Sequence, residues 1–114
     1  MDVRKLSDAV SVAPQLSVRE IADAARLGFR TLINNRPDGE DFLQPSAREL
    51  EAAAREQGLE YHHLPVVSGA LTERDVHAFR ALLAHAEQPV LAFCRSGTRS
   101  TTLWALAQAG GGNA

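Results

Sequence analysis

The most reactive side chain in this sequence is its single cysteine, Cys94, which follows the apolar run 89–93 and precedes a short polar segment. A buried strand that ends at a cysteine, a tight loop and a helix that begins near Thr98 would direct backbone N–H groups and the positive helix end toward the thiol. Such surroundings favour the thiolate, which is the nucleophilic form of cysteine. Arg99 can fold its guanidinium back over the loop and bind an oxyanion through two parallel hydrogen bonds. The pattern predicts a cysteine nucleophile in an anion-binding cradle.

Two roles are expected among the residues of this cradle. Cys94 and Arg99 are the expected catalytic residues. The rest of the loop and two residues of an earlier polar segment are expected to bind substrate: Arg95, Ser96, Gly97, Thr98, Ser100, Arg36 and Asp38. A second interpretation stays open, because free cysteine is among the most buried residue types and Cys94 could simply pack in the core.

Individual contacts can be expected for four of the substrate-binding residues. Ser96 and Ser100 should donate hydrogen bonds to the thiolate. Arg36 should bind an anionic substrate, and Asp38 should orient Arg36 or Arg99. For Asp38 the alternative is a plain turn, since Pro, Asp and Gly in succession are the residues that turns prefer.

Length and composition fit a single domain over residues 1–114. With 45% hydrophobic and 23% charged residues, the chain has the balance of a soluble globular protein. A net charge of -2 argues against nucleic acid as a partner, because phosphate-backbone affinity needs clustered Lys and Arg. No apolar run reaches the roughly 18–20 residues of a membrane helix, and no signal peptide is recognised, so no membrane partner and a cytoplasmic location are expected. A lone cysteine forms no internal disulfide, so a sulfur intermediate would need a thiol acceptor in trans.

Strands and helices are expected to alternate along the chain. Two Ser-x-x-Glu capping boxes, at Ser17 and Ser46, mark helix starts, and Thr72 can cap a third helix. Helices are expected over 17–27, 46–57, 73–86 and from about 98 to 108, with the last frayed by 110–112. Strands are expected over 6–14 (as a strand or short hairpin), 31–33, 59–66 and 89–93.

This alternation predicts an α/β fold with a mainly parallel central sheet flanked by helices on both faces. Parallel strands end at the same edge of a sheet, which is where such folds bind ligands. The loops 34–40 and 65–72 should therefore form the walls around Cys94.

The cysteine loop resembles those of two known families. Protein tyrosine and dual-specificity phosphatases place five residues between cysteine and arginine, whereas here four residues, 95–98, separate Cys94 from Arg99. The pattern Cys-Arg-x-Gly-x-Arg-Ser resembles the active loop of single-domain rhodaneses, which carry sulfur as a cysteine persulfide.

Beyond the loop, nearly the full length resembles the bacterial phosphatase-like domain of beta-lactamase-hydrolase-like proteins. The resemblance rests on segments 34–40, 44–46 and 61–65 and on the cysteine loop with Leu103 and Trp104. It implies a protein tyrosine/dual-specificity phosphatase-like fold that carries a rhodanese-type loop.

Chemical reasoning at this point favours a cysteine sulfurtransferase that forms a persulfide on Cys94 and takes a small anionic donor such as thiosulfate. A four-residue loop makes a smaller ring of N–H groups, and segment 66–72 offers no Asp or Glu as the general acid that a phosphatase needs. The alternative is a phosphatase (hydrolase) that uses Cys94 as nucleophile on a phosphate ester. A third reading is a non-catalytic anion-binding module. No cofactor and no metal are expected, because the adjacent His62 and His63 point to opposite faces of one strand.

Overall fold

A five-stranded sheet forms the middle of the molecule in the computed structural model, which describes residues 1–111. Its spatial order is β1-β2-β5-β3-β4, in which β1 is antiparallel to β2 and all other neighbours are parallel. The strands are β1 (Arg4–Lys5), β2 (Val10–Ala13), β3 (Thr31–Asn34), β4 (Glu60–His63) and β5 (Val90–Phe93). The expected mainly parallel sheet is confirmed, and the N-terminal strand region is a short hairpin.

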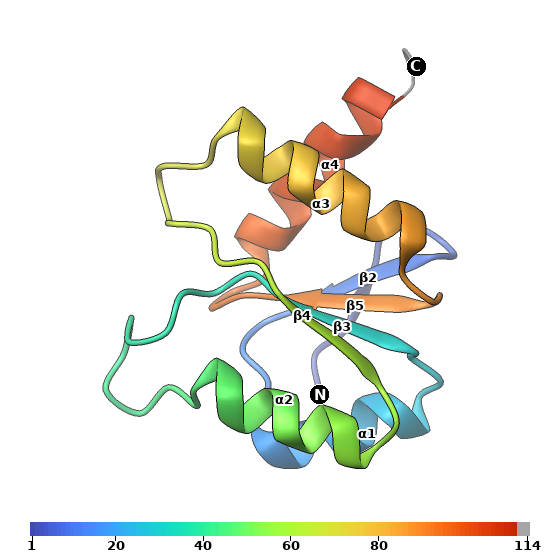
Figure 1. The fold of residues 1–114 in the computed structure, drawn as a ribbon, viewed down its shortest axis with the longest axis vertical. Helices are drawn as coiled ribbons and strands as arrows, with labels where there is room; N and C mark the ends of the chain where they lie inside the picture. Colours follow the sequence, from blue (N-terminus) through green and yellow to red (C-terminus); the bar gives the residue numbers. More distant parts are fainter. Residues whose placement is uncertain (112–114) are drawn as a thin grey trace.

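Helices cover both faces of this sheet. α1 (Val18–Arg26) and α2 (Ala47–Glu56) lie on one face, and α3 (Glu73–His85) and α4 (Thr98–Gly111) lie on the other (Figure 1). No helix in residues 1–111 is long and apolar enough to cross a membrane. The molecule is an α/β fold of three layers.

Capping boxes begin three of the helices, as the sequence predicts. Ser17, Ser46 and Thr72 each accept a hydrogen bond from the backbone three residues on, and the acidic side chain there bonds back to the cap. The helix that contains Gly110 departs from the expectation, because it continues through Gly111; Gly112 lies outside the described residues. Near this end of the helix, Arg80 of α3 donates from Nε to the Ala107 carbonyl at 3.1 Å, a contact that ties α4 to α3 despite the low helix propensity of glycine.

The core lies on both faces of the sheet, and β5 shows how one strand serves both. Leu91 and Phe93 belong to the cluster under α1 and α2, whereas Val90 and Ala92 belong to the cluster under α3 and α4. This alternation follows from the two-residue period of a strand. Because every residue of β5 is buried, the strand that leads to Cys94 is fixed from all sides.

Candidate active site

Cys94 directly follows β5, at the edge of the sheet where the parallel strands end. β5 lies between β2 and β3, so the cysteine sits at the centre of this edge. The side chain is fully buried, at 0% exposure, and the backbone N–H of Gly97 donates to its Sγ at 3.1 Å. Burial alone would also fit a core cysteine, but an N–H group aimed at the sulfur is what a cradle for a thiolate requires.

Gly97 gives the cysteine loop its shape. Its φ of +91° lies in the left-handed region, and an added Cβ would lie 3.4 Å from the carbonyl oxygen of Ala13. The N–H of Gln15 also donates to the carbonyl of Arg95 at 3.2 Å. The chain that leaves β2 therefore packs tightly against the loop, and glycine is the residue that permits both the turn and the close approach.

Helix α4 starts at the cysteine loop and keeps its N-terminal positive potential. The first turns of α1, α2 and α3 each contain an acidic side chain that bonds to the cap, whereas the first turn of α4 contains none. Ser96 accepts a hydrogen bond from the N–H of Thr98 and donates its hydroxyl proton to the Thr98 side chain. Without a carboxylate at this end, the helix dipole favours a bound anion or a thiolate.

Arg99, in the first turn of α4, connects the two loops that wall the site. Its Nη1 donates to Glu40 Oε2 at 2.7 Å and to the carbonyl of Val66 at 2.9 Å, and its Nη2 donates to Glu40 Oε1 at 2.8 Å. The hydrogen bonds to Glu40 raise the pKa of Arg99, and the nearby sulfur of Cys94 acts in the same direction. Segments 34–40 and 65–72 therefore do flank the cysteine loop, as the parallel topology predicts.

Glu40 is a functional candidate that the sequence reasoning missed. Its carboxylate accepts from Arg99 and also from Arg36 Nε, at 2.9 Å. The hydrogen bonds from Arg99 are the largest cause that lowers the pKa of Glu40 to about 2; burial opposes them, and the hydrogen bond from Arg36 adds to the lowering. Glu40 is thus an anion at any ordinary pH. No local spacing in the sequence signals its contact with Arg99, which lies 59 positions away.

The structure corrects the expected role of Asp38. Its carboxylate accepts from the backbone N–H of Ala47 at 2.8 Å, at the start of α2, and so it does not orient Arg36 or Arg99. Glu40 takes that place instead. The reason is local, because Asp38 lies in the turn that leads toward α2 and the free N–H groups of a helix start attract a carboxylate.

The two serines of the loop also differ from expectation. Neither hydroxyl donates to the sulfur: Ser96 bonds to Thr98, and Ser100 donates to Asn35 Oδ1 at 2.8 Å. Asn35 in turn donates its backbone N–H to the Phe93 carbonyl and its side-chain amide N–H to the Leu64 carbonyl. Ser100 and Asn35 therefore tie α4 to the ends of the strands, a contact between distant segments that no local motif signals.

Arg36 is buried, with only 4% of its side chain exposed. Its Nη1 donates to Gln15 Oε1 at 3.0 Å, and its Nη2 has no hydrogen-bond partner among the described residues. The geometry supports contact with Glu40 rather than with a substrate. Arg95, by contrast, is exposed at the mouth of the loop, where it can meet an anion.

No general acid is found where phosphatases of the expected fold carry one. Segment 66–72 has no carboxylate, and Asp75 beyond it closes the capping box of α3 with Thr72. Glu40 is close to Arg99, but its lowered pKa keeps it from donating a proton near neutral pH.

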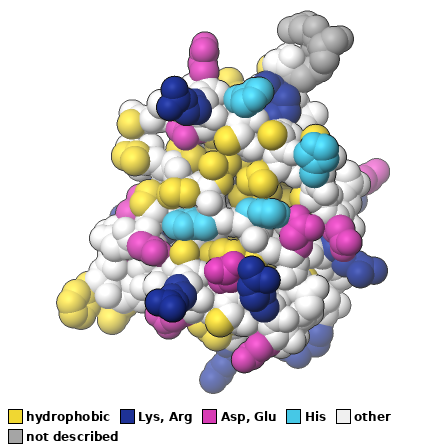
Figure 2. Space-filling model, in the orientation of Figure 1, with side chains coloured by type: hydrophobic (Ala, Val, Ile, Leu, Met, Phe, Trp, Pro, Cys, Tyr) yellow, Lys and Arg dark blue, Asp and Glu magenta, His cyan; other side chains and the backbone are white. Residues whose placement is uncertain are grey.

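Three of the four histidines line a groove of about 550 Å³ between β4 and α3, to which the cysteine loop contributes no residue. His62 bonds to Glu60 and His63 bonds to the carbonyl of Arg36 at 2.8 Å, while His85 lies on the opposite wall. Figure 2 shows histidines beside the apolar side chains exposed on this face. Within residues 1–111 no group of three His, Cys, Asp or Glu side chains could hold a metal ion.

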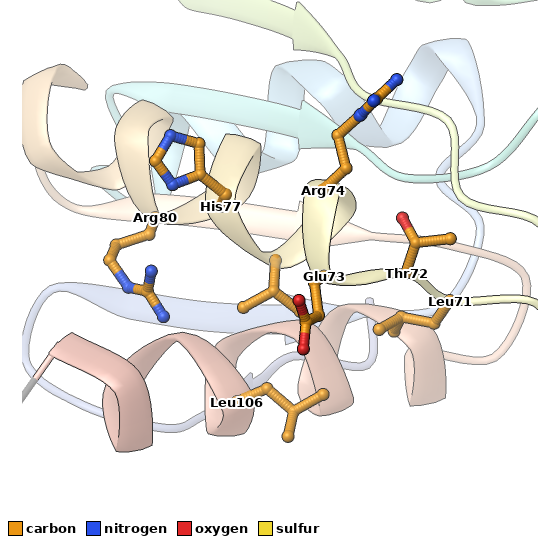
Figure 3. A pocket seen from close by; sticks show the side chains of 8 residues that line it. Leu71, Thr72, Glu73, Arg74, His77, Arg80 and Leu106 are labelled. Atoms are coloured by element: carbon orange, nitrogen blue, oxygen red, sulfur yellow. The ribbon is translucent and has the colours of Figure 1, made fainter.

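A second hollow, of about 730 Å³, lies between the start of α3 and α4 (Figure 3). Thr72, Glu73, His77, Arg80 and Leu106 are among its lining residues, and Arg74 points away from α4. Neither the cysteine loop nor Glu40 contributes to the lining of this hollow.

The α/β fold that carries this cysteine loop is protein tyrosine/dual-specificity phosphatase-like, as its solved neighbours show. A protein from Neisseria meningitidis that is described as a candidate phosphatase superposes with a TM-score of 0.89 at 38% identity, covering 96% of this chain and 78% of that one. TpbA of P. aeruginosa in complex with pTyr shares the fold, with a TM-score of 0.63 at 18% identity, covering 83% of this chain and 54% of that one.

The chain belongs to the family described as "Beta-lactamase hydrolase-like protein, phosphatase-like domain", whose model matches residues 2–111. The beta-lactamase hydrolase-like protein of Xylella fastidiosa is 39% identical over 108 residues, which cover 95% of this chain and 25% of that protein. The chain thus spans about a quarter of the length of the curated relatives that it matches. These relationships identify the chain as a phosphatase-like domain.

Proposed function

We propose that this domain is a cysteine-dependent phosphatase that acts on phosphate monoesters. The observation that carries the proposal is Arg99 held next to Cys94 at the start of α4, on a fold whose solved neighbours are phosphatases. The sulfurtransferase interpretation is not supported by these comparisons, so phosphate-ester hydrolysis replaces it as the leading function.

In the proposed reaction the Cys94 thiolate attacks phosphorus and forms an S–P bond while the P–O bond to the leaving group breaks. Arg99 and the N–H groups of the loop bind the phosphoryl oxygens, on which negative charge accumulates. Water then hydrolyses the thiophosphate, releases inorganic phosphate and restores the thiolate. Arg95 attracts the dianionic ester from solvent.

The lack of a carboxylic acid near the leaving group limits the substrates. General acid catalysis typically contributes about 10²–10⁴-fold, which is the disadvantage that an alkyl ester would suffer here. An aryl ester loses a phenolate that needs little protonation. Aryl phosphates, with phosphotyrosine as the protein-bound example, are therefore the substrate class that this site suits.

A second candidate function, sulfur transfer, is favoured by one specific observation. Four residues separate Cys94 from Arg99, which is the rhodanese spacing, and a persulfide transfer needs no general acid because its leaving group departs as a stable anion. In that reaction the thiolate would take the outer sulfur of thiosulfate, release sulfite and pass the sulfur to an external thiol.

Intact-mass measurement separates the two chemistries. The protein is incubated with p-nitrophenyl phosphate and, separately, with thiosulfate. Each reaction is then quenched and the intact mass of the protein is measured by mass spectrometry, with Cys94→Ser as the control. We expect turnover of the aryl ester and a phosphoryl adduct on Cys94 that the control lacks. A sulfur adduct removable by dithiothreitol, without any release of p-nitrophenol, would replace phosphatase by sulfurtransferase. If neither compound forms an adduct with Cys94, a non-catalytic anion-binding module is the interpretation that remains.

A further inference from the structure

An ion-pair clasp joins two loops beside Cys94. Arg99 reaches Glu40 on one loop and the Val66 carbonyl on the other, and its own side chain is only 12% exposed. The sulfur beside it has no exposed surface. An anion that binds the guanidinium of Arg99 must therefore displace Glu40 from it.

Arg36 lies on the far side of the same carboxylate and is incompletely bonded. Its Nε already donates to Glu40 Oε1, which Arg99 Nη2 shares. Its Nη2 is buried without a partner among the described residues. Nε and Nη2 point to the same side of a guanidinium and form the fork that binds a carboxylate side-on. One prong of that fork is occupied and the other is vacant.

We propose that Arg36 is a positioning residue that receives the Glu40 carboxylate when an anionic substrate takes Arg99. The inference rests on the proposed function for the identity of the anion. Glu40 Oε1 stays on Arg36 Nε, and a rotation of the carboxylate brings Oε2 from Arg99 Nη1 to the vacant Arg36 Nη2. Arg36 thus acts through Glu40 and never touches the substrate.

The exchange balances both hydrogen bonds and charge. Glu40 gives up two bonds to Arg99 and gains one to a buried donor, while Arg99 replaces them with bonds to the phosphoryl oxygens. Before binding, one carboxylate is shared by two guanidinium groups. Afterwards each guanidinium has its own anion. A buried donor without a partner is unfavourable, so its satisfaction contributes to anion binding.

Binding of inorganic phosphate tests the exchange without any turnover. Isothermal titration calorimetry compares the parent protein with Glu40→Gln, Arg36→Lys and the double variant. Glu51→Gln is the matched control, because it removes one negative charge from a surface pair on α2. Glu40→Gln keeps the shape of the clasp but weakens it, so we expect about tenfold tighter phosphate binding, the ratio that one lost charge-assisted contact produces.

Arg36→Lys keeps the positive charge but removes the fork. Phosphate binding should weaken by about tenfold in that variant, because Glu40 then has no receiving site. The same substitution in the Glu40→Gln background should change binding little, since no carboxylate needs to move. The KM for p-nitrophenyl phosphate should follow these affinities while kcat changes less.

The outcomes separate this inference from the proposed function. Phosphate binding that weakens in Glu40→Gln would overturn the exchange and make Glu40 a fixed support for Arg99. Equal effects of Arg36→Lys in both backgrounds would overturn the role of Arg36. If Arg36→Lys fails to fold, as judged by its unfolding transition, the comparison of phosphate affinity between Glu40→Gln and Glu51→Gln alone decides whether the exchange occurs. If the protein binds phosphate but does not hydrolyse p-nitrophenyl phosphate, the proposed phosphatase function is refuted. The comparison of phosphate affinities among the variants still tests the role of Arg36 in that case.

Discussion

Arg99 defines the geometry of the site at the scale of single residues, because it contacts both rim loops from the start of α4. Replacement by Lys keeps the charge but offers a point donor where the planar fork now reaches Glu40 and Val66 together. We expect Arg99→Lys to lose about 10²–10³-fold in kcat with p-nitrophenyl phosphate, the size of effect seen when a transition-state donor is removed.

Arg95→Ala serves as the comparison for that substitution. Its side chain is exposed at the loop, so its loss should mainly raise KM through weaker attraction of the anion. Near-normal kcat in Arg99→Lys would contradict the role given to the guanidinium.

Glu40 predicts a pH dependence of stability. Its pKa is lowered from 4.5 to about 2 in the folded protein, so its ionised form stabilises the fold above pH 4.5, and this contribution is lost as pH falls toward 2. The free energy of unfolding should therefore exceed that of Glu40→Gln by a constant amount above about pH 5.5, and the difference should shrink on acidification. Urea unfolding of both proteins at pH 7 and pH 3 measures this difference in the free energy of unfolding. A difference that grows at pH 3 would contradict the assignment.

Individual residues also show which parts of the candidate site could be predicted from the sequence. Cys94, Gly97 and Arg99 were predictable because strand end, loop and helix start are adjacent along the chain. Glu40 was not, because it meets Arg99 across 59 positions of sequence. The reassignment of Asp38 and Ser100 has the same cause, since each bonds to a residue more distant in the sequence than its nearest expected partner: Asp38 to Ala47 and Ser100 to Asn35.

At the scale of elements, the cysteine loop depends on one glycine. Gly97→Ala would place an L residue in the left-handed region, which costs about 1–2 kcal/mol, and would bring its Cβ into contact with the Ala13 carbonyl oxygen at 3.4 Å. We expect a loss of that size in the free energy of unfolding, together with a fall in kcat/KM as the loop shifts.

Gly39→Ala is the matched control, because Gly39 has a similar φ of +78° but open space around it. It should show a comparable loss of stability and far less loss of activity. Equal catalytic defects in the two variants would mean that the contact with Ala13 does not shape the cradle.

Helix starts were the most predictable elements, and strand ends the least. Side chains within four positions determine a capping box, so Ser17, Ser46 and Thr72 could be identified from spacing. The strand expected over 59–66 is shorter, Glu60–His63. Beyond it Leu64 and Val66 still donate to the carbonyls of Asn34 and Asn35, but irregularly, as the chain turns outward to form the rim.

At the scale of the whole molecule, parallel topology brings the loops together. Alternating strands and helices predict that all parallel strands end at one edge, and the contacts of Arg99 with both loops confirm it. The order of strands could not be read from the sequence. It depends on which apolar faces fit together, and β5, late in the chain, lies between β2 and β3.

That central position of β5 governs how the chain can fold during synthesis. Until residues 90–93 leave the ribosome, β2 has no partner on its inner side and β3 pairs only with β4. A fragment of residues 1–88 should therefore show no cooperative urea transition by circular dichroism, whereas the full chain should show one. A cooperative transition in the fragment would contradict this. Closing the long β2–β5 loop makes folding slow for a domain of this size, and Cys94 is set in place by the same late step that completes the sheet.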